Sequence, residues 1–461
     1  MRVWTMTESS SLDMPEVFIV PRELWHSAGP VLWGEEAEII PLPKGSPVVL
    51  ARDLRVVIVV DTPSIRQHRY RNFREAAQLA EQQGSAEVGI WTAGLNEKML
   101  PSVIFGLEQG FYHYGEHKDP VQEIKVVADQ TLFERLELLS AIACGQSWAR
   151  DKVNCPANEK PPEHLAVLYQ QDAPKAIQFH TYTHEALTEL GAGGILAVGS
   201  GSERPPVLLV GRYQGQPGAP WLALVGKGIV FDSGGISLKA REGMGKLKAD
   251  MAGSAAVMAA VRIVAENAWP INVMAWAPLA ENLPDGAAYR PGDVVTMLDN
   301  TRVEIISTDA EGRLVLADAL TMAISEGASA VVDIATLTGS NVVALGAIRA
   351  TLIGNNEVLA KEVRESGDMM EEPVWEMPHD AEYALLNRSS IADLKNSGGR
   401  AGGTISAGLF VGNFAGKVPW AHVDIAGLAF NDTDSTGGAT GYGVALLVEM
   451  CKRWGHASRD I

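Results

Sequence analysis

The chain has 461 residues, 46% of them hydrophobic, which is enough for sizeable buried cores, and a chain of this length usually forms two domains. Its 38 lysine and arginine residues are outnumbered by 56 acidic residues, and the formal net charge of −18 speaks against a broad surface for nucleic acid or for an anionic membrane. The three cysteines show no paired spacing, the N-terminus has acids where a secretory signal needs an apolar core, and no apolar run is long enough to span a membrane, so we expect a cytoplasmic protein.

The first part of the chain mixes strands and helices and predicts a small α/β domain over residues 1–129. Val56–Val60 is β-branched throughout, as is typical of a strand, and residues 73–82 have the pattern of a helix. Residues 130–150 place apolar side chains at helical spacing without a proline, which predicts one long connecting helix. The remainder, residues 151–461, is then a separate and larger domain.

The larger domain alternates strand-like segments with alanine-rich helices. This alternation predicts an α/β fold with a mixed, largely parallel sheet flanked by helices, and ligands should gather at the ends of its strands. A glycine-rich segment near Gly191 lacks the third glycine of a dinucleotide motif, because Leu196 occupies that position. The predicted strands are 206–210, 222–230, 271–277, 331–335 and 421–425.

The motif Ser-Thr-Asp-Ala-Glu-Gly-Arg-Leu at residues 307–314 lies between a predicted strand, 303–306, and a predicted helix, 314–325. If the strand geometry continues to Glu311, then Asp309 and Glu311 point to the same side and form a site for a hard cation. Arg313 follows at the helix start, where an anion is favoured. Taken alone, two acids before a helix are more often a solvated loop, so the interpretation depends on further ligands upstream.

Such ligands are found between residues 226 and 250. The glycine pair after Asp232 ends a predicted strand abruptly and exposes its carboxylate. Asp250 precedes an alanine-rich helix that runs to about Glu266, where the alternative role is an N-cap. Lys227 lies within an otherwise apolar strand, where burial would lower its pKa and make a neutral amine plausible.

Four segments carry a resemblance to a known family. They read GKGIVFDSGGISLK, KADMAGSAAV, STDAEGRLVLADAL and DIATLTGS. In this order they resemble the leucyl aminopeptidase family of dinuclear metal exopeptidases. The resemblance covers roughly residues 150–447, including NCPAN, GGRAGGTISAG and WAHVDIAG, and is weak in the N-terminal domain.

The resemblance implies two divalent metal ions per subunit, Zn²⁺ or Mn²⁺, with Asp232 and Glu311 bridging them. It implies that Lys239 and Arg313 are catalytic, with a bicarbonate bound at Arg313 as the base. It also implies a homohexamer that acts on peptide substrates. The five implied metal ligands are Lys227, Asp232, Asp250, Asp309 and Glu311, and the residues implied to contact the substrate main chain are Thr336, Leu337 and Gly339, for which the alternative is a plain turn at a strand end.

These residue types suit hydrolysis of a peptide bond. Two cations can activate a water molecule and polarise a carbonyl, and a lysine that is not bound to metal can stabilise the developing oxyanion. The sequence departs from the family pattern at Ser307, Leu247 and Ala249, positions that bear on side-chain preference, so a simple preference for leucine is in doubt.

We therefore predict a cytoplasmic, metal-dependent aminopeptidase that removes N-terminal residues from peptides, with a role in peptide turnover. Three alternatives remain. A dipeptidase of the same fold, for instance one acting on cysteinylglycine, would differ in its dependence on substrate length. A DNA-binding regulator is disfavoured by the net charge of −18. A two-metal phosphatase would hydrolyse phosphate esters.

Overall fold

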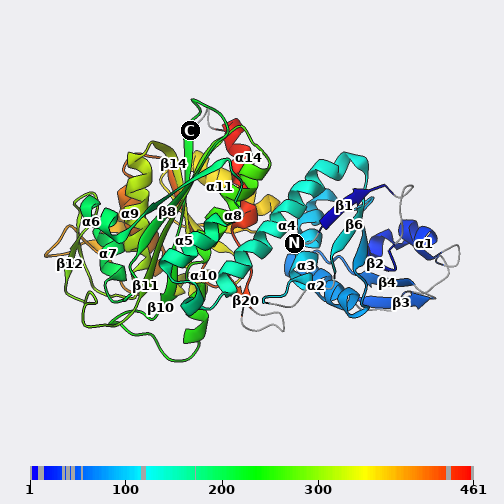
Figure 1. Cartoon of the computed structure of the whole chain (residues 1–461), viewed down its shortest axis with the longest axis horizontal. Helices are drawn as coiled ribbons and strands as arrows, with labels where there is room; N and C mark the ends of the chain where they lie inside the picture. The colour runs from blue at the N-terminus through cyan, green and yellow to red at the C-terminus, as the bar shows by residue number, and fades with distance from the viewer. Residues whose placement is uncertain are drawn as a thin grey trace. The chain divides into compact units, whose positions relative to one another are not determined.

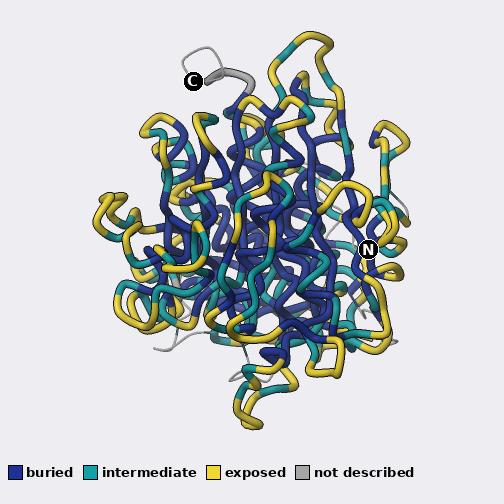
Figure 2. Tube along the Cα trace, turned by 90° about the vertical axis from the view of Figure 1, so that its left-hand side faces the viewer, coloured by how far each residue is buried: buried dark blue, intermediate teal, exposed yellow. Residues whose placement is uncertain are grey.

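The computed structural model divides into two compact units, Met1–Ser147 and Trp148–Ile461 (Figure 1). Buried residues follow the strands and the inner faces of the helices, and exposed residues gather in the connections (Figure 2). None of the helices in the described parts of the chain combines the length and hydrophobicity needed to cross a membrane. The described residues are 3–8, 15–33, 37, 42, 47–52, 55–115, 121–171, 173–431 and 438–457.

The first unit contains a six-stranded sheet with the strand order β1-β6-β5-β2-β4-β3. Its neighbouring strands are parallel except for β3, which is antiparallel to β4. The predicted strand Val56–Val60 lies within β4, and the predicted helix 73–82 is the second half of α2. The bounds are β1 Val3–Thr7, β2 Val17–Pro21, β3 Val48–Arg52, β4 Arg55–Val60, β5 Glu87–Trp91, β6 Glu123–Val127, α1 Trp25–Trp33, α2 Arg66–Gln82 and α3 Leu100–Phe111.

The predicted connecting helix is present with shifted ends. A short 3₁₀ helix, η5 (Gln130–Leu132), precedes α4 (Phe133–Asn154). Helix α4 therefore continues past the predicted end at Arg150 and passes through the boundary between the two units in the chain. The division of the chain into domains at residues 129 and 150 stays a prediction.

The second unit is built on a nine-stranded sheet with the order β16-β15-β18-β14-β9-β11-β8-β7, and β10 also pairs with β11. Five of its strand pairs are parallel and three are antiparallel. The prediction of a smaller N-terminal α/β part and a larger α/β part with a mixed, largely parallel sheet flanked by helices is confirmed. The bounds are β7 Ile177–Tyr182, β8 Val207–Gln214, β9 Trp221–Gly226, β10 Gly228–Asp232, β11 Asn272–Asn282, β14 Ala328–Ala335, β15 Ala350–Gly354, β16 Val374–Glu376 and β18 Trp420–Asp424.

Helices cover both faces of this sheet. Val331 and Ala335 of β14 belong to a buried cluster that includes helix α9, whereas a side chain at Gly443 would touch Ile334 and Ala256. Because side chains alternate along a strand, α8 lies on the face opposite α9. The helices are α5 Pro162–Gln170, α6 His184–Leu190, α7 Gly193–Gly199, α8 Ala252–Glu266, α9 Gly312–Ser325, α10 Gly339–Leu345, α11 Glu357–Met369, α12 Ala381–Ala384, α13 Gly403–Gly412 and α14 Val444–Ala457.

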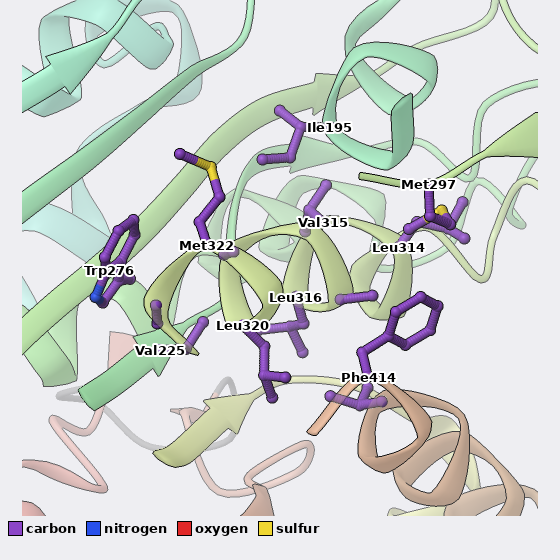
Figure 3. Packing of buried hydrophobic residues seen from close by; sticks show 14 of the residues in the cluster. Ile195, Val225, Trp276, Met297, Leu314, Val315, Leu316, Leu320, Met322 and Phe414 are labelled. Carbon is purple, nitrogen blue, oxygen red and sulfur yellow. The ribbon is translucent and has the colours of Figure 1, made fainter. Parts of the chain in front are cut away.

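Helix α9 carries apolar side chains around nearly its whole circumference, so it is stable only where other elements cover it on nearly all sides. Leu314, Val315 and Leu316 are each fully buried in the core cluster, and Figure 3 shows them spreading around the helix. Met297 lies beside Leu314, and Phe414 lies below the same end of the helix (Figure 3). This packing anchors the helix whose first turn carries Arg313 and whose N-cap is Glu311.

Two predicted strands are interrupted at the site. The single strand predicted over 222–230 is broken at Lys227, which separates β9 from β10. The strand predicted over 303–306 is only Arg302–Glu304 (β13), and a turn at Thr308 and Asp309 follows it. A small sheet, β12-β13-β17, supports this turn; its other strands are β12 Val294–Thr296 and β17 Leu394–Lys395, and a separate pair consists of β19 Phe430–Asn431 and β20 Gly438–Ala439.

Candidate metal centre

Three carboxylates meet at one point of the larger unit. Oxygen atoms of Asp232, Asp309 and Glu311 lie within 4.8 Å of one another. Asp232 ends strand β10, Asp309 lies in the turn after β13, and Glu311 directly precedes α9. Asp232 and Glu311 are 3% and 1% exposed, whereas Asp309 is exposed. The expectation that Asp309 and Glu311 share a side is met, but by a turn and not by strand alternation.

Asp250 joins this cluster through Lys227. The Lys227 Nζ atom lies 2.8 Å from Asp250 Oδ2 and 2.8 Å from Glu311 Oε1, and it donates a hydrogen bond of 3.0 Å to the Thr336 carbonyl. Asp250 follows the 3₁₀ helix η7 (Met244–Ala249), so it precedes α8 without being its N-cap, which is Met251.

Glycines let the backbone approach Lys227 closely. A Cβ atom at Gly312 would lie 2.6 Å from Lys227 Cε, and one at Gly253 would lie 2.9 Å from the Lys227 backbone nitrogen. Both distances are too short for real side chains. The glycines after Glu311 and at the start of α8 therefore allow the lysine to reach its acidic partners.

Lys239 connects the other two carboxylates. Its Nζ atom lies 2.7 Å from Asp232 Oδ2 and also contacts Asp309 Oδ1. Unlike Lys227, which is almost completely buried, the Lys239 side chain is 25% exposed. The two ammonium groups thus lie among four carboxylates, and this cluster has an excess of negative charge.

The charges shift one another's pKa values. Burial raises the pKa of Asp250 and, together with the neighbouring Glu311, that of Asp232 above the ordinary carboxyl range. Burial by itself lowers the pKa of Lys227, but the carboxylates of Asp250, Glu311 and Asp232 raise it beyond its ordinary value. The predicted lowering at Lys227 is therefore wrong for this arrangement, because attraction to three acids exceeds the cost of burial.

The donor set fits divalent cations. Carboxylate oxygens are ligands that Mn²⁺ and Zn²⁺ accept, and a lysine amine can add a nitrogen ligand. Four carboxylates would match the charge of two divalent ions. The arrangement therefore supports the two-metal interpretation of the sequence, in which Lys227, Asp232, Asp250, Asp309 and Glu311 hold the ions.

Arg313 binds the main chain directly after β17. It is only 8% exposed, and its Nη1 atom donates a hydrogen bond of 2.7 Å to the Asn396 carbonyl. Burial lowers the pKa of Arg313 to about 10, despite the neighbouring acids. Within the described part of the chain its buried Nε atom has no hydrogen-bond partner. An unpaired donor on a buried cation suits an anion.

The segment predicted to contact the substrate follows strand β14. The Thr336 hydroxyl donates a 2.6 Å hydrogen bond to Asp250 Oδ1, so the structure brings this residue to the acidic cluster. The Leu337 N–H donates to Asp424 Oδ1 at 3.1 Å instead. Gly339 begins α10, and a Cβ atom there would meet open space. The Leu337 N–H is therefore engaged within the protein, whereas the space beside Gly339 is free.

Three polar residues that hold the acidic turn were missed in the sequence. The Asn396 side chain donates to the Ser307 carbonyl at 2.7 Å and accepts from the Ile306 N–H at 2.8 Å. The Tyr289 hydroxyl and the Asn282 amide each donate a 2.9 Å hydrogen bond to the Thr308 carbonyl. No motif marks these residues. The only signal is their position beside predicted strands or glycine-rich loops.

These features define an α/β protein with a buried acidic site suited to metal ions, and a model of the cytosol aminopeptidase family, catalytic domain, matches residues 147–448. The probable cytosol aminopeptidase of Alkaliphilus metalliredigens is 40% identical over 374 residues, 77% of this chain and 75% of that protein. That of Geobacter sulfurreducens is 43% identical over 383 residues, 78% of this chain and 76% of that protein.

Solved structures agree with this assignment. The bottromycin maturation enzyme BotP in complex with Mn is 34% identical with a TM-score of 0.82, over 95% of this chain and 99% of that one. A mutant of tomato leucine aminopeptidase is 27% identical with a TM-score of 0.84, over 98% of this chain and 97% of that one. The chain belongs to the cytosol aminopeptidase family and is a metallo-exopeptidase.

Proposed function

We propose that this protein is a metal-dependent aminopeptidase that releases N-terminal residues from peptides in the cytoplasm. The observation that carries the proposal is the meeting of Asp232, Asp309 and Glu311, with oxygens within 4.8 Å of one another, in a chain of this family. Peptide turnover is the role that such an activity serves.

In this proposal Asp232 and Glu311 would be the ligands shared by two divalent ions, with Lys227 and Asp250 at one ion and Asp309 at the other. When bound, two divalent ions supply an activated water and polarise the scissile carbonyl. Their charge would also remove the reason for the raised pKa of Lys227, because the carboxylates that attract its proton would be neutralised. Lys227 could then act as an amine ligand.

We assign to Lys239 the role of stabilising the developing oxyanion. It is the more exposed of the two lysines, and its partners Asp232 and Asp309 are proposed metal ligands. With these carboxylates engaged by metal, the Lys239 ammonium, whose side chain is 25% exposed, would be free of its present ion pairs. It can then donate a hydrogen bond to the negative charge that forms on the substrate carbonyl oxygen.

We assign to Arg313 the role of binding a bicarbonate ion. Its buried Nε atom lacks a partner among the described residues, and it lies in the first turn of α9, where the helix dipole favours an anion. Arg313 would hold this anion where a base for the attacking water is needed, a role for which the motif offers no histidine.

We assign contacts with the substrate main chain to three residues after β14: Thr336, Leu337 and Gly339. The hydroxyl of Thr336 already contacts the cluster, and the lack of a side chain at Gly339 leaves room for a peptide. We further propose a homohexamer, and no role in binding nucleic acid, given the net charge of −18.

A second candidate is the maturation of one particular peptide. It rests on the similarity to the bottromycin maturation enzyme BotP, which extends over 95% of this chain. In that case the enzyme would cleave one extended precursor far better than short peptides.

The test is an assay of the metal-stripped protein on aminoacyl amides, dipeptides and longer peptides, with Zn²⁺, Mn²⁺, Co²⁺ or Mg²⁺ added back. Cleavage of free N-termini that requires metal and is lost in Lys239→Ala and Asp309→Ala is the expected result. Cleavage confined to dipeptides would indicate a dipeptidase, and cleavage confined to one long peptide would indicate maturation. Hydrolysis of phosphate esters alone would identify a phosphatase. If no substrate is cleaved, a gel-shift titrated with salt tests the DNA-binding alternative.

A further inference from the structure

Asn282 is a buried amide that contacts two of the proposed bridging ligands. It is the last residue of β11 and pairs in register with Asp232 of the parallel strand β10. Its side chain is 0% exposed. The Nδ2 atom lies 2.8 Å from Asp232 Oδ1, 2.9 Å from the Thr308 carbonyl oxygen and 3.5 Å from Glu311 Oε2.

The orientation of this amide follows from its neighbours. All three atoms around Nδ2 are oxygen acceptors, so the nitrogen and not the oxygen must face them. The Oδ1 atom faces Gly235 and has no hydrogen-bond partner in the described residues. A Cβ atom at Gly235 would lie only 2.7 Å from this oxygen, so the glycine makes room for it.

The main chain of Asn282 also holds the residue that follows Asp232. Its carbonyl accepts hydrogen bonds from both the N–H and the hydroxyl of Ser233, at 3.0 Å and 2.7 Å. Ser233 directly follows Asp232. Asn282 thus holds the end of β10 by its main chain and the turn before Asp309 by its side chain.

We infer that Asn282 is a positioning residue that sets the orientation of Asp232 relative to Glu311 and thereby the affinity for metal. This inference rests on the proposed function. The two N–H groups of the amide bind Asp232 and the Thr308 carbonyl, and the nitrogen at 3.5 Å from Glu311 Oε2 adds a weaker attraction between two carboxylates that repel each other. Outer hydrogen bonds of this kind change metal affinity by about 10–100-fold.

Asn272 provides a matched control at the opposite end of the same strand. It is 1% exposed, and its side chain also makes two hydrogen bonds, to the Ala219 carbonyl at 2.8 Å and from the Gln216 N–H at 3.1 Å. Both of its partners are main-chain atoms of a surface connection. Replacing Asn272 therefore measures the cost of losing a buried asparagine from β11 without changing any contact of the acidic cluster.

The experiment compares metal binding by the full-length, metal-stripped wild type, Asn282→Ala and Asn272→Ala. Free Mn²⁺ is measured by electron paramagnetic resonance during titration, and the melting temperature of each apoprotein is recorded. We expect Asn282→Ala to weaken Mn²⁺ binding by about 10–100-fold. Asn272→Ala should lower the melting temperature to a similar degree and leave the Mn²⁺ affinity within about twofold, since it has no partner in the cluster.

If Asn282→Ala does not fold, Asn282→Leu takes its place. Leucine keeps the branched shape of the asparagine side chain but has no hydrogen-bond donor. The Thr308 carbonyl keeps Tyr289 as a donor and Asp232 keeps the Gly234 N–H, so the fold has other support. Unchanged affinity in a folded Asn282 variant, or equal weakening in Asn272→Ala, would overturn the inference. Absence of Mn²⁺ and Zn²⁺ binding by the wild type would instead contradict the proposed function.

Discussion

Two buried lysines of the larger unit have similar burial and opposite surroundings. The Nζ atom of Lys227 contacts the carboxylates of Asp250 and Glu311. The Nζ atom of Lys160 donates hydrogen bonds of 2.9 Å each to three main-chain carbonyls, those of Lys152, Val153 and Lys248. Three neutral acceptors fit the three protons of an ammonium group, but they carry no net charge to balance it.

The consequence is visible in their pKa values. Burial lowers the pKa of Lys160 to about 7. At Lys227 the same cost is exceeded by the attraction of three carboxylates, and the pKa is raised. Burial alone therefore does not decide the charge of a lysine; the net charge around it does.

The two surroundings also differ in what they connect. Lys160 joins the last turn of α4 to η7, the short helix that directly precedes Asp250. Lys248 of η7 adds a second link to α4: its Nζ atom donates a 2.5 Å hydrogen bond to the Asn154 carbonyl. We interpret the surroundings of Lys160 as support and those of Lys227 as the site itself, and the following changes test this difference.

The largest effect is expected from Glu311→Gln, which keeps the size of the side chain and removes one charge from the cluster. Activity should fall by more than about 100-fold, because even changes to outer hydrogen bonds cost about 10–100-fold. Steady-state rates with saturating Mn²⁺ measure it. Glu304→Gln, at the last residue of β13 and outside the cluster, is the control. Comparable rates for both variants would contradict the assignment of Glu311 as a ligand.

Lys227→Met should lower the stability of the metal-free protein by about 3–5 kcal/mol, because buried carboxylates lose their counter-charge. Urea unfolding of the metal-stripped protein measures this loss. Saturating Mn²⁺ should restore part of it, since the proposed site places the ion on the same carboxylates. A variant as stable as the wild type without metal would show that the carboxylates are not charged there.

Lys160→Met should have a smaller effect, about 1–3 kcal/mol, because three carbonyls lose a donor but no buried charge is left unpaired. The rate per folded molecule at saturating Mn²⁺ should stay within about tenfold of wild type, since Lys160 contacts no proposed ligand directly. Parallel measurements on both lysine variants test the comparison. A loss of activity as large as that of Lys227→Met would contradict a purely supporting role.

A pH dependence of stability is also expected from Lys160. Between about pH 7 and 10.5 the unfolded chain holds a proton on Lys160 that the folded protein lacks. Stability should therefore rise with pH across this window through Lys160. Lys227, whose pKa is raised, contributes no such slope there, because it is protonated in both states. Unfolding free energies at several pH values should show a shallower rise in Lys160→Met than in the wild type; equal slopes would indicate that Lys160 stays charged when buried.

The sequence by itself determined the α/β class and the mixed, largely parallel sheet, and its resemblance to a family pointed to the residues of the acidic cluster. Much of this information is local. Strands and buried helices show in the spacing of apolar residues, and Asp309, Glu311 and Arg313 stand within one short motif whose residue types suit a cation beside an anion.

Only the tertiary structure decided which polar residues support the cluster and how its charges balance. Asn282 reaches Asp232 across 50 positions of the chain, and Asn396 reaches Ser307 across 89. A lone asparagine in a sequence has no visible partner. The direction of the pKa shift at Lys227 likewise depends on acids that folding brings to it from Asp250 and Glu311, because Coulombic attraction depends on distance in space and not along the chain.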